Sequence, residues 1–168
     1  MTGGLDAETN VMRWLESRLA DALRLADVLA ALEELDGRDG VKSIRFQGDK
    51  VRATRMKADA IGSMLADIEG RRMALEVERA EIVERLNSAR AVLRRARVGA
   101  SAENTAKLDY CERRYIDAMP RRDAAAAVGA GEWAAKRWPR AVASLVYSCE
   151  PERFDYAEEP EPLGYWLI

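Results

Sequence analysis

The side chains best suited to chemistry in this sequence are basic, and they gather between residues 120 and 140. Arginine donates paired hydrogen bonds to phosphate and to guanine edges, and lysine adds a compact positive charge. Five basic residues in this stretch accompany only two acidic ones, Asp123 and Glu132. We expect seven side chains to face double-stranded DNA, at its phosphates or in its major groove: Arg121, Arg122, Glu132, Trp133, Lys136, Arg137 and Arg140.

The stretch from Leu108 to Ser144 has the spacing of a helix-turn-helix. Such a motif needs a small residue where its two helices cross, and Ala125 fits that place. Four residues later the backbone must turn with a positive φ, which Gly129 adopts at little cost. Pro139 predicts a kink or an end in the second helix. The expected small core comprises Tyr115, Ile116, Val128, Ala135 and Trp138. The alternative is an alanine-rich helical pair that packs for structure alone.

Several chemistries are excluded by the residues that are missing. The sequence has no histidine, so catalytic triads and histidine metal sites are ruled out within one chain. Its two cysteines, Cys111 and Cys149, lack the spacing of a zinc site and indicate free thiols in a reducing cytoplasm, with Cys111 in the core. We therefore expect no enzyme, no metal and no cofactor. Without a signal sequence or a membrane span, the expected location is the cytoplasm of a bacterial host.

The composition, rich in Ala, Arg, Glu and Leu, favours an all-α fold. Apolar residues spaced three or four apart predict a first helix that ends at Asp36-Gly37: Val11, Leu15, Leu19, Ala22, Ala26, Leu29 and Leu32. Asp49 is expected to cap a longer second helix, whose stripe Arg72 and Arg79 interrupt: Ile61, Leu65, Ile68, Leu75, Ile82, Leu86, Ala89, Leu93 and Ala96. A helix of that length must bury its stripe against the first helix, as an antiparallel hairpin, or against a second chain, as a coiled coil.

The expected organisation is therefore a helical arm over residues 1–98, a helix-turn-helix module over 101–148 and an acidic aromatic tail over 149–168. Ser101 is the expected cap of the module's first helix. Homodimerisation through the arm is the simplest inference. Four arginines near the end of the arm are expected on a solvated basic face, or on flanking DNA phosphates: Arg90, Arg94, Arg95 and Arg97.

The tail, EPERFDYAEEPE and beyond, is acidic, and its prolines oppose a continuous helix. In one interpretation it is a solvated extension whose aromatic residues dock on this chain or a partner: Phe154, Tyr156, Tyr165 and Trp166. In the other it masks the basic face until a partner displaces it.

The arm followed by ERRYIDAMPRRDAAAAVGAGEWAAKRWPRAVASL resembles the RinA/ArpU-like transcriptional regulators of phages and prophages. In that family a helical half precedes a module like region 4 of sigma factors, which opens as Arg-Tyr-Ile-Asp-Gly. Residues 114–117 match this opening, Arg122-Asp123 match the start of the next helix, and Ala125 and Gly129 match the crossing and the turn. Three positions depart from the pattern: Pro120 and Gly131, where Ser or Thr is usual, and Pro139.

The resemblance implies a DNA-binding activator that works near a promoter with host RNA polymerase. Two other functions stay open. The first is a mobile-element inhibitor or adaptor that binds a host protein, in which the tail imitates DNA charge through Glu158, Glu159 and Glu161. The second is a DNA-packaging recognition subunit, which would form a ring of many copies where a regulator would form a dimer.

Overall fold

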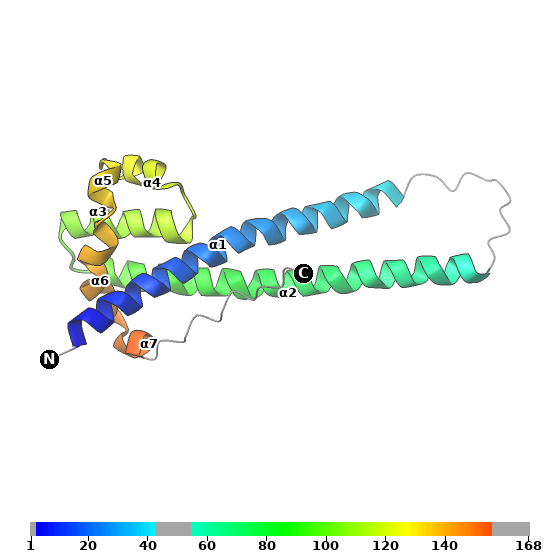
Figure 1. Ribbon diagram of the computed structural model, residues 1–168, viewed down its shortest axis with the longest axis horizontal. Coiled ribbons are helices and arrows are strands. Elements are labelled where there is room, and N and C mark those ends of the chain that lie inside the picture. The colour runs from blue at the N-terminus through cyan, green and yellow to red at the C-terminus, as the bar shows by residue number, and fades with distance from the viewer. Residues whose placement is uncertain (1–2, 43–54, 156–168) are drawn as a thin grey trace. The chain divides into compact units, whose positions relative to one another are not determined.

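The computed structural model describes residues 3–42 and 55–155 and contains only helices there (Figure 1). The predicted all-α fold, a long antiparallel helix pair followed by shorter helices, is confirmed. Across these described ranges no helix is long and apolar enough to cross a membrane. The elements are α1 (Gly3–Lys42), α2 (Arg55–Arg97), α3 (Ala102–Cys111), the π-helical turn η1 (Glu112–Ile116), α4 (Arg121–Ala127), α5 (Glu132–Ala135), α6 (Trp138–Cys149) and α7 (Pro151–Asp155).

The chain divides into two compact units. The terminal unit comprises residues 1–23 and 84–168, and the middle unit comprises residues 24–83. The long helices α1 and α2 therefore each contribute one part to each unit, and these parts run antiparallel. All of the shorter helices belong to the terminal unit.

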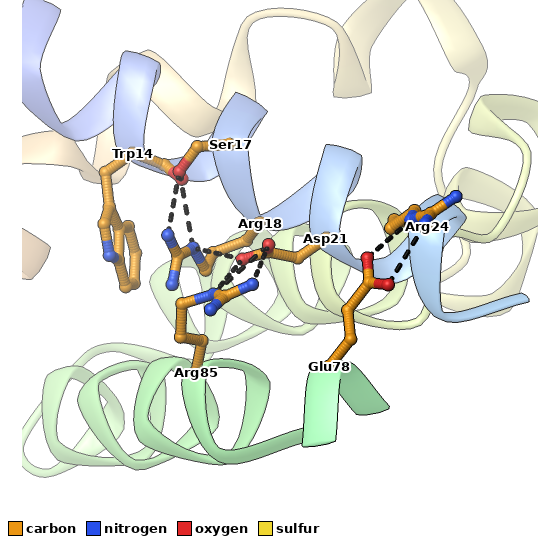
Figure 2. A network of polar contacts seen from close by, with 7 residues as sticks. All are labelled: Trp14, Ser17, Arg18, Asp21, Arg24, Glu78 and Arg85. Atoms are coloured by element: carbon orange, nitrogen blue, oxygen red, sulfur yellow. Dashed lines mark hydrogen bonds and ion pairs between the residues drawn. The ribbon is translucent and has the colours of Figure 1, made fainter. Parts of the chain in front are cut away.

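In the middle unit, α1 and α2 meet along a narrow apolar seam. Val28 and Leu35 of α1 and Ile82 of α2 are buried. At its edge, the Arg24 guanidinium donates to both carboxylate oxygens of Glu78 at 2.6 and 3.1 Å (Figure 2). This pairing raises the pKa of Arg24 and holds its positive charge against the neighbouring helix. The Arg72 guanidinium lies 2.6 Å from the Asp36 carboxylate, so an arginine that interrupts the stripe is matched by an acid.

The predicted stripe of α1 is wrong in the middle unit. Ala26 and Leu29 are exposed, and Val28 and Leu35 are buried instead. A seven-residue step separates the two buried positions, because two packed helices keep a 3.5-residue period that a straight 3.6-residue face does not follow. In α2 the predicted stripe holds at Ile82, but Leu65 is exposed.

The predicted end of the first helix at Gly37 is also wrong, since α1 continues to Lys42. Glycine permits a positive φ but does not impose one, and Gly37 is absent from the residues whose φ is positive. The helix therefore runs on through it. The predicted capping residue Asp49 and the side chain of Ile61 lie outside what the structure describes.

The core of the terminal unit is formed by the N-terminal part of α1, the C-terminal part of α2 and the shorter helices. It includes Val11 and Leu15 of α1, four residues of the predicted α2 stripe together with Val92, and Cys111, which confirms that this thiol is a core residue. Burial raises the pKa of Cys111 to about 12. Beside the core, Arg85 Nη2 donates to Asp21 Oδ1 at 2.9 Å (Figure 2). The α2 residues buried in this core are Leu86, Ala89, Val92, Leu93 and Ala96.

Helix α7 returns the chain to the start of α1. The Phe154 ring is buried, with its edge against Trp14 at 5.4 Å between centroids and with Tyr147 at 6.1 Å. Asn10 Nδ2 donates to the Phe154 carbonyl oxygen at 2.8 Å. Phe154 therefore docks on its own chain, as the first interpretation of the tail predicts. The other tail aromatics, Tyr156, Tyr165 and Trp166, lie outside the described residues, as do Glu158, Glu159 and Glu161.

The predicted basic face at the end of α2 is corrected, because three of its four arginines are paired with acids in or at the ends of the shorter helices. Arg90 lies 2.8 Å from Asp117, and Arg97 lies 2.8 Å from Asp109. Arg95 pairs with Glu150. These arginines hold the C-terminal helices to α2, and Arg94 alone of the four is exposed without such a described pairing.

Candidate nucleic-acid interface

The chain reaches the candidate interface through a tight turn at the end of η1. The Asp117 amide donates to the Glu112 carbonyl oxygen at 3.1 Å, which closes the π-helical turn. Ala118 then adopts a φ of +53°, a left-handed conformation in which a Cβ is strained. Arg114 Nη1 donates to the Met119 carbonyl oxygen at 3.0 Å and braces the turn from outside. The chain thereby reverses and starts α4 at Arg121, with Pro120 as a cap that makes no side-chain hydrogen bond.

The turn between α4 and α5 has the geometry that the sequence predicts. Gly129 has a φ of +72°. Its amide donates to the Ala126 carbonyl oxygen at 3.0 Å, and the Ala130 amide donates to the Ala125 carbonyl oxygen at 2.9 Å. These two bonds form a Schellman motif, which satisfies the last carbonyls of α4 and ends the helix sharply. The next helix therefore leaves at a fixed angle.

The second helix of the motif is short at first and then resumes. Gly131 caps α5 without a side-chain hydrogen bond, as expected from the residues available. After one turn the backbone stays in right-handed helical φ and ψ at Lys136 and Arg137, and α6 begins at Trp138. Pro139 lies in the first turn of α6 and is buried. Because proline supplies no amide to the Ala135 carbonyl, the regular helix is interrupted there, as predicted.

A small core supports this geometry. Ala125 and Ala135 are buried, which allows α4 and α5 to lie close together. The Trp138 ring is half-buried with its edge toward Tyr110, at 5.9 Å between centroids. Ile116 is buried, and the remaining predicted core residues, Tyr115 and Val128, are half-buried. Burial also raises the pKa of Tyr115 to about 12.

All seven predicted interface residues are exposed. Trp133 is the extreme case, with 84% of its surface accessible. The Lys136 ammonium lies 5.5 Å from the centre of the Trp133 ring, so a cation and an aromatic face stand together on one turn of helix. Arg140 is 74% exposed in its side chain and lies 3.6 Å from Glu8 of α1.

The positive charge of this face is largely uncompensated. Within the described residues, Arg121, Arg122, Lys136 and Arg137 form no ion pair. Arg121 and Arg122 also occupy the first turn of α4, where the helix dipole disfavours positive charge. An anion brought to this face would therefore relieve a local repulsion, and a phosphate backbone is such an anion.

A polar hollow of the terminal unit is a weaker candidate for a binding site than this basic face. A shallow hollow of about 400 Å³ is lined by Arg94, Arg97, Asp109, Glu112, Arg113 and Asp117. Its acids already pair with Arg90 and Arg97, so they are not free to bind a cation. In the part of the chain that the structure describes, no group of three or more Cys, Asp or Glu side chains is placed to hold a metal ion.

One ion pair and one turn of the interface were not predicted from the sequence. Glu8 is far from Arg140 in sequence, and no local pattern links them. Nothing in the residues around Ala118 predicts its left-handed φ, since alanine adopts such a φ only with strain. Comparison with models of known protein families, with curated proteins and with solved structures gave no significant match, so the case for this interface comes from its own geometry.

Proposed function

We propose that this chain binds double-stranded DNA through α4, α5 and the turn between them, and that it regulates transcription of phage or prophage genes near a promoter used by host RNA polymerase. The observation that supports this most is the Schellman turn at Gly129, which joins a buried crossing at Ala125 to an exposed, basic helical turn. An alanine-rich pair that packs for structure alone has no need of four cations on its outer face that pair with none of the described acids.

The proposed docking follows from which residues project. In helix-turn-helix proteins the N-terminal part of the second helix enters the major groove, and the first helix crosses the backbone. In this chain the corresponding positions are Glu132, Trp133, Lys136 and Arg137 for the groove. Arg121, Arg122 and Arg140 would contact phosphates, which fix position and contribute no sequence information directly.

The interruption of the helix at Pro139 limits the number of base pairs that the protein can contact in the major groove. Only α5 and the irregular turn after it project, and α6 buries Val142, Ala143 and Val146 in the terminal unit. We therefore assign a large share of the affinity to phosphate contacts and expect base contacts over a short site. Two copies on adjacent half-sites would double that short site.

The experiment is a titration of a fluorescein-labelled duplex from the chain's own genomic neighbourhood, followed by anisotropy at low and at moderate salt. The full chain is compared with a chain ending at Asp155, which removes Glu158, Glu159 and Glu161 but keeps the buried Phe154. Salt-dependent binding by both forms supports the proposal, and tighter binding by the shorter form adds a masking role for the tail. No binding by either form contradicts it and favours the adaptor function.

A further inference from the structure

Helix α2 has a second apolar face within the middle unit, on the side away from the seam. Six exposed residues recur three or four apart and are apolar or glycine: Gly62, Ala66, Gly70, Met73, Val77 and Ala80. At 100° per residue they fall in a band about 80° wide. The half-buried and buried residues Ile68, Leu75 and Ile82 lie on the opposite side of the same helix.

This outer face exposes large apolar side chains. Met73 is 70% exposed and Val77 is 59% exposed, although they are close neighbours on one turn. A charged helix that only needed to cover one partner would carry polar residues there. A contiguous apolar band with charged neighbours, such as Glu69 and Glu76 along one edge, is typical of a surface that packs against another helix.

The sizes of the residues in the band indicate which helix packs against it. The first half of the band is small, with Gly62, Ala66 and Gly70, and the second half is large, with Met73 and Val77. A copy of the same helix laid antiparallel would place Met73 opposite Gly70 of the partner subunit and Val77 opposite Ala66 of the partner subunit. Each large side chain would then meet a small one, and the contact would be repeated by two-fold symmetry.

None of the described residues of the same chain explains why position 70 is a glycine. A Cβ at Gly70 would meet nothing within 4 Å, and its φ lies outside the left-handed range. Glycine inside a helix also costs about 1 kcal/mol relative to alanine. The missing side chain is explained if it leaves room for a side chain from outside.

We propose that the chain forms a symmetric dimer in which α2 of each copy packs antiparallel on α2 of the other along this face. The band is about 27 Å long, from 1.5 Å per residue. Two helix faces of that length bury an area near the roughly 1,000 Å² that a specific interface requires, so the affinity is modest, in the micromolar range.

The charges beside the band are mixed. Glu69 and Glu76 lie along one edge of it, and Glu76 Oε1 lies 3.9 Å from Arg72 Nε on the same helix. In an antiparallel two-fold pair the same edges of the two copies meet, so charges of both signs come together there. Because these charges offset one another, added salt should change the dimer little. DNA binding weakens steeply with salt, and the dimer does not depend on the proposed DNA binding.

The test is sedimentation equilibrium of the full chain without DNA, from about 1 to 300 µM, the range such an interface requires. Gly70→Leu fills the space for Met73 of the partner subunit while it raises helix propensity, so the single chain stays folded. Ala74→Leu adds similar bulk outside the band, about 80° around the helix from its middle, and is the control. We expect dimers in the unmodified chain, at least tenfold weaker dimers for Gly70→Leu and a change within about twofold for Ala74→Leu.

The pairing register has its own test. In a Cys149→Ser background, Ala66→Cys chains are mixed with Val77→Cys chains and oxidised. The register predicts that the mixed disulfide dominates over both homodimeric disulfides. A chain that stays monomeric over the whole range, a dimer that Gly70→Leu leaves intact, or disulfides in statistical proportions each overturn the proposal. A failure here leaves the anisotropy titration with DNA unaffected.

Discussion

The Lys136 ammonium lies 5.5 Å from the centre of the Trp133 ring, and 84% of the Trp133 surface is accessible. An exposed contact of this kind stabilises a helix by about 0.5–1 kcal/mol at most. Its value to the fold is therefore small. An exposed indole beside a cation is better explained as a recognition surface, because aromatic and basic side chains dominate the binding energy of interfaces.

Replacement of Trp133 with alanine should separate binding from folding. We expect the free energy of unfolding to change by about 0.5 kcal/mol or less, because little of the side chain is buried. Affinity for duplex DNA should fall about tenfold, or ~1.4 kcal/mol. Trp138→Ala is the control, since that ring packs on Tyr110 and its loss should destabilise the chain by about 3 kcal/mol. Unchanged DNA affinity for Trp133→Ala would remove this residue from the interface.

Arg137→Ala should change how binding depends on salt. A side chain that neutralises one phosphate contributes about 0.9 to the slope of log affinity against log salt, so the variant's slope should be smaller by about that amount. The matched control is Arg95→Ala, because Arg95 already pairs with Glu150 on its own chain. Anisotropy titrations at four salt concentrations give both slopes. Equal slopes for Arg137→Ala and the unmodified chain would contradict a phosphate contact there.

Ala118→Gly should stabilise the chain. The φ of +53° at this position strains a residue that bears a Cβ, and glycine removes that strain. We expect a gain of about 1 kcal/mol, or roughly 3 °C in Tm for a chain of this length. Gly129→Ala should do the reverse, since a Cβ there meets no atom within 4 Å and only the φ of +72° opposes it. Thermal unfolding followed by circular dichroism measures both, and a lower Tm for Ala118→Gly would refute the turn geometry.

Phe154→Ala should destabilise the terminal unit by about 3–5 kcal/mol, the usual cost of removing a buried phenyl ring. The ring contacts Trp14 and Tyr147, so its loss affects residues from both ends of the chain. A chain ending at Ser148 should be destabilised similarly, and one ending at Asp155 should unfold near the unmodified denaturant midpoint. Similar midpoints for the two shortened chains would show that α7 does not contribute to the core.

Alkaline pH should destabilise the chain through a buried thiol and a half-buried phenol. Folding raises the pKa of Cys111 from 9.0 to about 12 and that of Tyr115 from 10.0 to about 12, in both cases chiefly by desolvation. Their contribution to stability is complete below the unfolded pKa values and is lost as the pH rises from about 9 to about 12. Urea midpoints across this range should therefore decline. In Cys111→Ala the decline should begin about one pH unit higher, and an onset at the same pH would exclude this thiol.

Local signals predicted the parts of the structure that local forces determine. Ser101 accepts a hydrogen bond from the Asn104 amide at 3.2 Å, as a cap should, and Gly129 turns as glycine can. The buried crossing at Ala125 and the buried stripe at the end of α2 follow from residue size and spacing. Each of these features depends on residues within a few positions of one another.

Long-range contacts were not accessible from the sequence. Arg90 and Asp117 are 27 residues apart, and Asn10 and Phe154 are 144 apart, so no periodic pattern relates them. A run of arginines in the sequence predicts a solvated face, because the sequence does not show which distant acids pair with it. The phase of the α1 seam was missed for a related reason, because the partner helix decides whether Ala26 or Val28 faces inward.

The measurement that tests the proposed function most directly is a map of amide chemical shifts in the full chain on addition of a duplex that it binds, or of a mixed-sequence duplex at low salt. We predict that the shifts concentrate at residues 121–122 and 131–140 and include the Trp133 indole N–H, while residues of α2 in the middle unit stay unchanged. Shifts confined to other surfaces, or none at all at saturating duplex, would contradict the assignment of α4, α5 and their turn as a DNA-binding surface.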